Sequence, residues 1–237
     1  MITLGIDLSS SREGTAAAVI EWNKSHMVVH VPALRCDDDQ LDELIDRADV
    51  VGIDAPFGWP KAFVEAVAGW REISWSSENR RRLQFRPTDL FVRDMLGIWP
   101  LSVSTDRIAL PAMRANALLT RHEVEDRSGD GKFYEVYPAA TLKCWGLPHR
   151  GYKLLDPNCQ NIRLGILREL RAKLQFLDIP NEYASTSDVL DALIACLTAR
   201  LAFQKQTVDP QGEHVRSEGW IHFPRDGSLP IGEGSAK

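Results

Sequence analysis

Short apolar runs alternate with longer amphipathic segments along this chain, and the two patterns predict different elements. Residues 2–8 and 50–54 are apolar and β-branched, which is typical of buried strands. Residues 15–22 and 27–31 predict two further strands, so the first three strands should form an antiparallel meander. A fifth strand is expected over 133–137.

Helices are expected where apolar residues recur every three or four positions. Asp37 can cap one helix, another spans about 111–125, and Asn158 can cap a long third one. The last helix, about 188–203, is apolar on nearly every face, so we expect it to be buried. Residues 73–110 are the least regular stretch.

The order of these elements predicts an α/β protein. We expect one domain over residues 1–225, with a helical or irregular insertion over about 57–130. A short strand around Trp220 precedes a flexible tail over 226–237, which is rich in glycine and serine.

Two of the predicted strands end in the same way, with Gly-Ile-Asp. Asp7 closes the first and Asp54 closes the fourth, and a loop follows each carboxylate at once. Desolvating a carboxylate there is costly unless a cation or hydrogen bonds satisfy it. If the two strand ends are adjacent, the pair predicts a divalent-metal site; the alternatives are a cap on the Ser9-Ser10 turn and an Asx turn before Pro56.

The last helix carries a second acidic pair, Asp188 and Asp191, in its first turn. Residues three apart share one face of a helix, so both side chains should point at whatever the sheet presents there. The competing interpretation is that acidic residues in a first turn only complement the helix dipole. The apolar character of the rest of this helix favours the metal-site interpretation.

Composition excludes several classes of protein. With 237 residues, 44% hydrophobic and 26% charged, the chain is typical of a globular protein, and its net charge of −5 argues against a non-specific nucleic-acid coat protein. The four cysteines are scattered, which argues against a zinc site or a disulfide framework. The first strand begins at residue 2 and no apolar run is long enough to span a membrane, so we expect a cytoplasmic protein without a signal peptide.

Several short motifs, taken in order, resemble the ribonuclease H-like superfamily, and more narrowly an uncharacterised family of predicted RNase H-like nucleases that is known as a domain of unknown function. The matching segments are Gly5-Ile6-Asp7, Gly52-Ile53-Asp54-Ala55-Pro56, Arg86-Pro87-Thr88-Asp89, Tyr134-Glu135-Val136-Tyr137-Pro138, Ser187-Asp188-Val189-Leu190-Asp191-Ala192-Leu193 and Glu218-Gly219-Trp220-Ile221. They span residues 2 to 223, nearly the whole chain.

This resemblance implies a five-stranded mixed sheet in the order 3-2-1-4-5, with helices on both faces. It implies that Asp7, Asp54, Asp188 and Asp191 hold two Mg²⁺ or Mn²⁺ ions that support hydrolysis of a phosphodiester, in nucleic acid or a smaller molecule. Hard oxygen ligands suit these ions better than zinc.

Five further residues are candidates for the same site. Glu135 is unusual in an aromatic, β-branched strand and is a candidate further ligand; otherwise it faces water. Ser9 and Ser10 could bind a phosphate or form only a polar turn. Arg86 and Arg93 suit phosphate recognition, with a solvated loop as the alternative.

Two other functions stay open. A catalytically silent binding or regulatory protein would keep the fold without turnover. A sugar-kinase or actin-like ATPase would share the Gly5-Ile6-Asp7 loop, but the second Gly-x-Asp strand comes too early in this chain for that architecture. The exposed aromatic residues are compatible with a homodimer.

Overall fold

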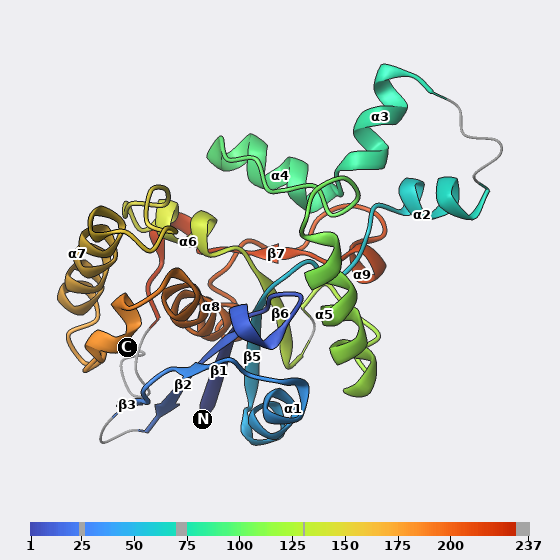
Figure 1. The fold of residues 1–237 in the computed structure, drawn as a ribbon. Helices are drawn as coiled ribbons and strands as arrows, with labels where there is room; N and C mark the ends of the chain where they lie inside the picture. The colour runs from blue at the N-terminus through green and yellow to red at the C-terminus, as the bar shows by residue number, and fades with distance from the viewer. Residues whose placement is uncertain (24–26, 70–74, 130, 231–237) are drawn as a thin grey trace.

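The fold is an α/β sandwich in which helices cover both faces of one mixed sheet (Figure 1). A computed structural model describes residues 1–23, 27–69, 75–129 and 131–230. The strands are β1 (Ile2–Asp7), β2 (Ala16–Trp22), β3 (Met27–Val29), β4 (Ala33–Leu34), β5 (Val50–Asp54), β6 (Phe133–Val136) and β7 (Ile221–His222). Their order is β3-β2-β1-β5-β6-β7, with β4 also paired to β2.

The expected order of the five main strands is therefore present, but the predicted number of strands is wrong. Within the described residues the sheet has seven strands, because β4 and β7 extend it. The short strand expected around Trp220 is β7, whereas β4 was not expected, because its two residues are too few to show an alternating pattern. The meander β1–β2–β3 is antiparallel, whereas β5, β6 and β7 run parallel to β1 or to one another.

Helices fill the connections between the strands. Their bounds are α1 (Asp38–Arg47), α2 (Lys61–Ala68), α3 (Ser77–Gln84), α4 (Pro87–Leu96), α5 (Ala109–Arg121), α6 (Pro138–Cys144), α7 (Pro157–Lys173), α8 (Ser187–Phe203) and α9 (Val215–Glu218). A capping box formed by Asp37 and Gln40 begins α1. Asp156 caps α7, two residues before the expected cap, and Thr186 caps α8.

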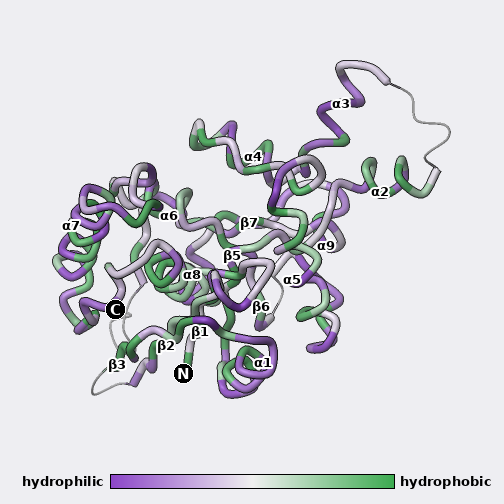
Figure 2. Tube along the Cα trace, in the orientation of Figure 1, coloured by the Kyte–Doolittle hydropathy of each residue, from purple (hydrophilic) through white to green (hydrophobic). Residues whose placement is uncertain are grey.

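The stretch 73–110 is more regular than its pattern suggests, because it contains α3 and α4. The sequence of α3 is almost wholly polar, so it has no apolar stripe to reveal it; Figure 2 shows it mostly in purple. A serine cap at Ser76 begins α3, and Pro87 occupies the first turn of α4. Both helices lie between β5 and β6, within the segment expected to be an insertion. Part of the expected tail, residues 231–237, lies outside the described residues.

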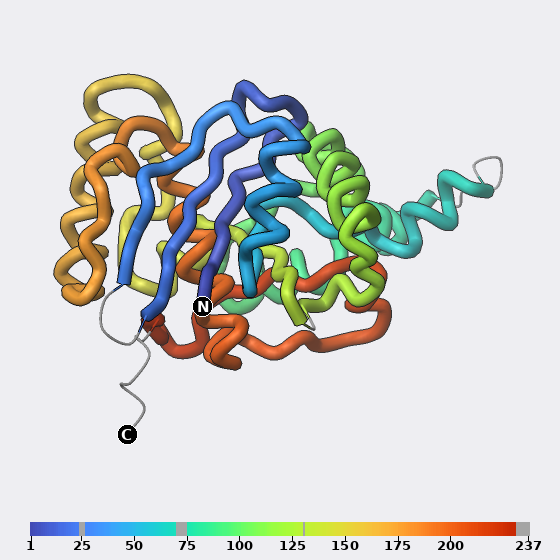
Figure 3. The backbone as a smooth tube through the Cα atoms, turned by 90° about the horizontal axis from the view of Figure 1, so that it is seen from below, coloured from blue at the N-terminus to red at the C-terminus, as the bar shows by residue number. Residues whose placement is uncertain are grey.

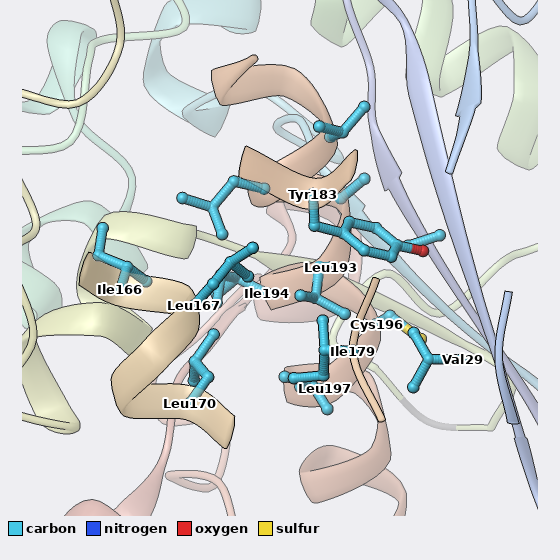
Figure 4. Close-up of a cluster of buried hydrophobic side chains, with 14 of the residues drawn as sticks. Val29, Ile166, Leu167, Leu170, Ile179, Tyr183, Leu193, Ile194, Cys196 and Leu197 are labelled. Carbon is cyan, nitrogen blue, oxygen red and sulfur yellow. The ribbon is translucent and has the colours of Figure 1, made fainter. Parts of the chain in front are cut away.

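The helix α8 forms the centre of the core, packed between α7 and the sheet (Figure 4). Two glycines let its backbone approach the strands closely. A Cβ atom on Gly5 would collide with the backbone of Ala192 and Cys196, and one on Gly52 would lie 2.5 Å from the Ala195 carbonyl oxygen. As expected, α8 is buried along nearly its whole length.

The opposite face of the sheet is covered by α1 and α5 (Figure 3). Leu41 and Ile45 of α1 and Leu118 of α5 pack with Leu4 and Ile53 of the sheet. Side chains alternate between the two faces of a strand, so residues two positions apart share a face. Within the described residues, no helix is both long enough and apolar enough to cross a bilayer.

Candidate active site at the carboxyl ends of β1 and β5

The two strand-end aspartates are direct neighbours. Strands β1 and β5 pair in parallel with Asp7 in register with Asp54, and adjacent strands lie about 4.8 Å apart. Asp7 is two residues beyond Gly5, and Asp54 is two residues beyond Gly52. Both carboxylates therefore leave the sheet on the face that α8 covers.

The first turn of α8 supplies a third carboxylate, that of Asp191, which is completely buried. Its Oδ1 accepts a 2.8 Å hydrogen bond from the Tyr152 hydroxyl. Its Oδ2 lies 2.7 Å from the ammonium group of Lys153. The close packing that Gly5 permits brings this turn of the helix up to the strand end.

The pKa values of the two strand-end carboxylates are strongly raised. Burial, then the charges of Asp54 and Asp191, raise the pKa of Asp7 well above its ordinary value. Burial also raises the pKa of Asp54, to about 7; Lys153 opposes this shift, and Asp191 adds to it. No hydrogen bond or ion pair to the carboxylate of Asp7 or Asp54 occurs across residues 1–23, 27–69, 75–129 and 131–230.

Lys153 and Tyr152 were not expected from the sequence. Both lie in the irregular connection between α6 and α7, where no periodic pattern exists. Burial alone would lower the pKa of Lys153, but the charges of Asp191, Asp54 and Asp7 outweigh that effect and raise it. The available signal was indirect: an aspartate in an otherwise apolar buried helix needs a partner.

A cavity of about 260 Å³ opens beside the carboxylates. Asp7, Asp54 and Lys153 line its polar side, and Arg86, Glu135 and Tyr137 also reach it. Its remaining wall is apolar and is formed by Leu8, Ala55, Pro56, Pro100, Leu101, Ile108, Pro111, Val136 and Ile221. A concave apolar site with a few convergent polar groups is typical of small-ligand binding.

Glu135 and Arg86, two of the expected site residues, reach the same cavity but pair with each other in a buried network. Glu135 is in register with Ile53, so its side chain leaves the sheet on the face opposite Asp54. The Arg86 guanidinium donates to Glu135 Oε1 at 2.7 Å and to Asp89 Oδ1 at 2.9 Å. Glu135 Oε2 accepts from the Phe57 amide at 2.9 Å.

The remaining expected residues lie outside the cavity lining. The Ser9 amide bonds to Thr15 Oγ1, and Ser10 is exposed on the turn. Arg93 stacks over the ring of Trp99, 4.8 Å from its centroid. Asp188 is half-buried, accepts from the Ser187 hydroxyl and has a small effect on Asp7.

The donor set fits a hard divalent cation only in part. In the described parts of the chain, no group of three or more His, Cys, Asp or Glu side chains is arranged to hold a metal ion. Both oxygens of Asp191 already face Tyr152 and Lys153. Asp7 and Asp54 remain as two adjacent carboxylates without partners, and Mg²⁺ is commonly held by one or two carboxylates together with water and phosphate oxygens.

The fold and site define an α/β protein with a carboxylate-lined cavity at the carboxyl ends of its central strands, where ligands bind in such sheets. Residues 5–214 match the model of the family described as protein of unknown function (DUF429), and the chain belongs to this family. No curated protein matches the sequence. No solved structure matches it either.

Proposed function

We propose that this protein is a metal-dependent hydrolase of phosphodiesters, with its site at Asp7 and Asp54. The observation that carries the proposal is the pair of in-register strand-end carboxylates, which are half-buried beside the cavity and have no hydrogen-bond partner among the described residues. Two such groups side by side repel each other unless a cation lies between them. The strand order β3-β2-β1-β5-β6 also supports an RNase H-like fold, in which this is the catalytic edge.

Each residue has a distinct task in this proposal. Asp7 and Asp54 would hold Mg²⁺ or Mn²⁺, while Tyr152 and Lys153 orient Asp191 and keep its charge compensated. The chemistry that a divalent cation supplies in such a site is polarisation of a phosphoryl oxygen and neutralisation of developing charge. The apolar residues of the cavity lining, Leu101 among them, would pack against the non-reacting part of the substrate.

The cavity favours a small phosphodiester or a single nucleotide unit over a long stretch of backbone. Its volume is about 260 Å³. A surface that follows a polynucleotide presents several cationic side chains to successive phosphates. Here Arg86 is committed to Glu135 and Asp89, and Arg93 lies outside the cavity lining.

The test combines binding with turnover. Purified protein is melted in EDTA and in millimolar Mg²⁺ or Mn²⁺, and is then assayed on bis(p-nitrophenyl) phosphate and on labelled single-stranded and duplex DNA and RNA. We expect the cation to raise Tm and to be required for cleavage. Asp7→Asn should lower turnover at least about 100-fold and leave Tm in EDTA unchanged or higher, since it relieves the carboxylate repulsion.

Asp46→Asn is the matched control, because Asp46 is an exposed aspartate on α1, remote from the strand ends. It should retain both the cation-dependent rise in Tm and turnover. A wild-type Tm that does not respond to either cation, together with no turnover on any substrate, would overturn the proposal.

A binding or regulatory role is the second candidate, and one observation favours it. Among the described residues, the arginine in the cavity lining is Arg86, and its buried guanidinium is engaged by Asp89 and Glu135 rather than available to a phosphoryl group. A raised Tm in Mn²⁺ without turnover on the substrates above would support this role over hydrolysis.

A further inference from the structure

Lys153 reaches the carboxylate cluster from a loop that is fixed at three consecutive carbonyl groups. The buried guanidinium of Arg163 donates to the carbonyl oxygens of Tyr152 at 2.6 Å and Leu154 at 2.9 Å. The hydroxyl of Ser187, at the start of α8, donates to the Lys153 carbonyl at 3.3 Å. The backbone of this lysine is thus held by α7 and α8 together, even though its side chain is 58% exposed.

The positive charge of Lys153 limits how many divalent cations the nearby carboxylates can bind. The ammonium group of Lys153 compensates the charge of Asp191, and Asp7 and Asp54 bring two further negative charges once a cation binds them in the ionised form. One divalent cation then neutralises what remains. A second divalent cation would have to displace an ammonium group from a fully buried carboxylate to which it lies 2.7 Å away.

The geometry agrees with this charge balance. The two carboxylates without partners, Asp7 and Asp54, lie side by side on adjacent strands. The third, Asp191, already has a cation at one oxygen and a hydroxyl donor at the other. The carboxylate oxygens of Asp7 and Asp54 can therefore bind one cation between them. Lys153 lines the same cavity.

We propose that the site takes a single divalent cation, between Asp7 and Asp54, and that the ammonium group of Lys153 occupies the place of a second one beside Asp191. This inference rests on the proposed metal-dependent function and replaces the two-ion arrangement expected from the sequence. In the substrate complex, Lys153 would contact a phosphoryl oxygen, because it lines the same cavity as Asp7 and Asp54.

The experiment counts bound Mn²⁺ by isothermal titration calorimetry and by electron paramagnetic resonance of the free ion. Wild type should bind one ion. Lys153→Met should bind two, the first about tenfold more tightly, because a neighbouring positive charge is gone and Asp191 is released. The double variant Lys153→Met/Asp191→Asn should again bind one ion, because the carboxylate that would bind the second ion is removed.

Lys173→Met serves as the control, because Lys173 is exposed at the end of α7. It should bind one ion, like wild type. Two ions on wild type, or one on Lys153→Met, would overturn the lysine inference and leave the proposed function standing. No ion on any variant would overturn both. The wild-type count needs no variant, so the inference stays testable even if Lys153→Met fails to fold.

Discussion

Two groups of acidic residues lie near the same edge of the sheet, and they differ in how their charges are compensated. Glu135 and Asp89 share the guanidinium of Arg86, which is 2% exposed and also donates to the Glu218 carbonyl. Asp7 and Asp54, one or two strands away, have neither a hydrogen bond nor an ion pair among the described residues.

This difference in charge compensation distinguishes a structural network from a ligand-binding site. Acceptors that are all satisfied by the protein hold elements together and leave nothing for a ligand. The Arg86 network joins α4, β6 and α9, which are far apart in the sequence. Carboxylates that are desolvated and unpartnered raise the free energy of the folded state, which is the signature of a functional group.

The largest expected effect is the loss of stability on removing Arg86 from its network with Glu135 and Asp89. Arg86→Met leaves the carboxylates of Glu135 and Asp89 buried without a cation, which should cost about 3–5 kcal/mol. Chemical denaturation should show this loss, and Tm should fall by roughly 10 °C. Arg80→Met, at an exposed position of α3, should change stability by less than about 0.5 kcal/mol. Equal effects of the two variants would contradict the structural role of Arg86.

A second substitution, Gly5→Ala, should disturb the site at Asp7 and Asp54 and leave the Arg86 network intact. Gly5→Ala places a methyl group against the α8 backbone, so α8 must move away from β1, at a cost of about 3 kcal/mol. The movement carries Asp191 away from Asp7, so the cation-dependent rise in Tm should shrink as well. Gly165→Ala is the matched control: within the described chain nothing lies within 4 Å of an added Cβ there, and alanine favours the helix by about 1 kcal/mol.

These contrasts also show which features sequence reasoning could reach. The strand ends at Asp7 and Asp54 could be predicted, because an apolar run that stops at a carboxylate is a local pattern. The burial of Asp191 could be predicted from the composition of its helix. Once β1 and β5 are neighbours in the sheet, as the predicted element order implies, Asp7 and Asp54 lie side by side.

The partners of these groups could not be predicted, because they depend on the paths of irregular segments. Lys153 lies in the connection before α7, and only the bonds from Arg163 and Ser187 fix where it points. The face taken by Glu135 depends on its register with Ile53, which neither strand reveals alone. The short strand β4 could not be predicted either, because two residues show no alternating pattern and only its pairing with β2 defines it.

The smallest expected effect is a dependence of stability on pH that arises from the strand-end carboxylates. The pKa of Asp54 is about 7 in the folded protein and about 4 in an unfolded chain. Between these values the folded state keeps a proton that the unfolded state has released, so stability in EDTA should fall as the pH rises from 5 to 7.5. Divalent cations bind the ionised carboxylate, so the rise in Tm that Mn²⁺ causes should grow over the same interval. Asp54→Asn should flatten both curves, and wild-type curves that are already flat would mean that the strand-end carboxylates are not a strained pair.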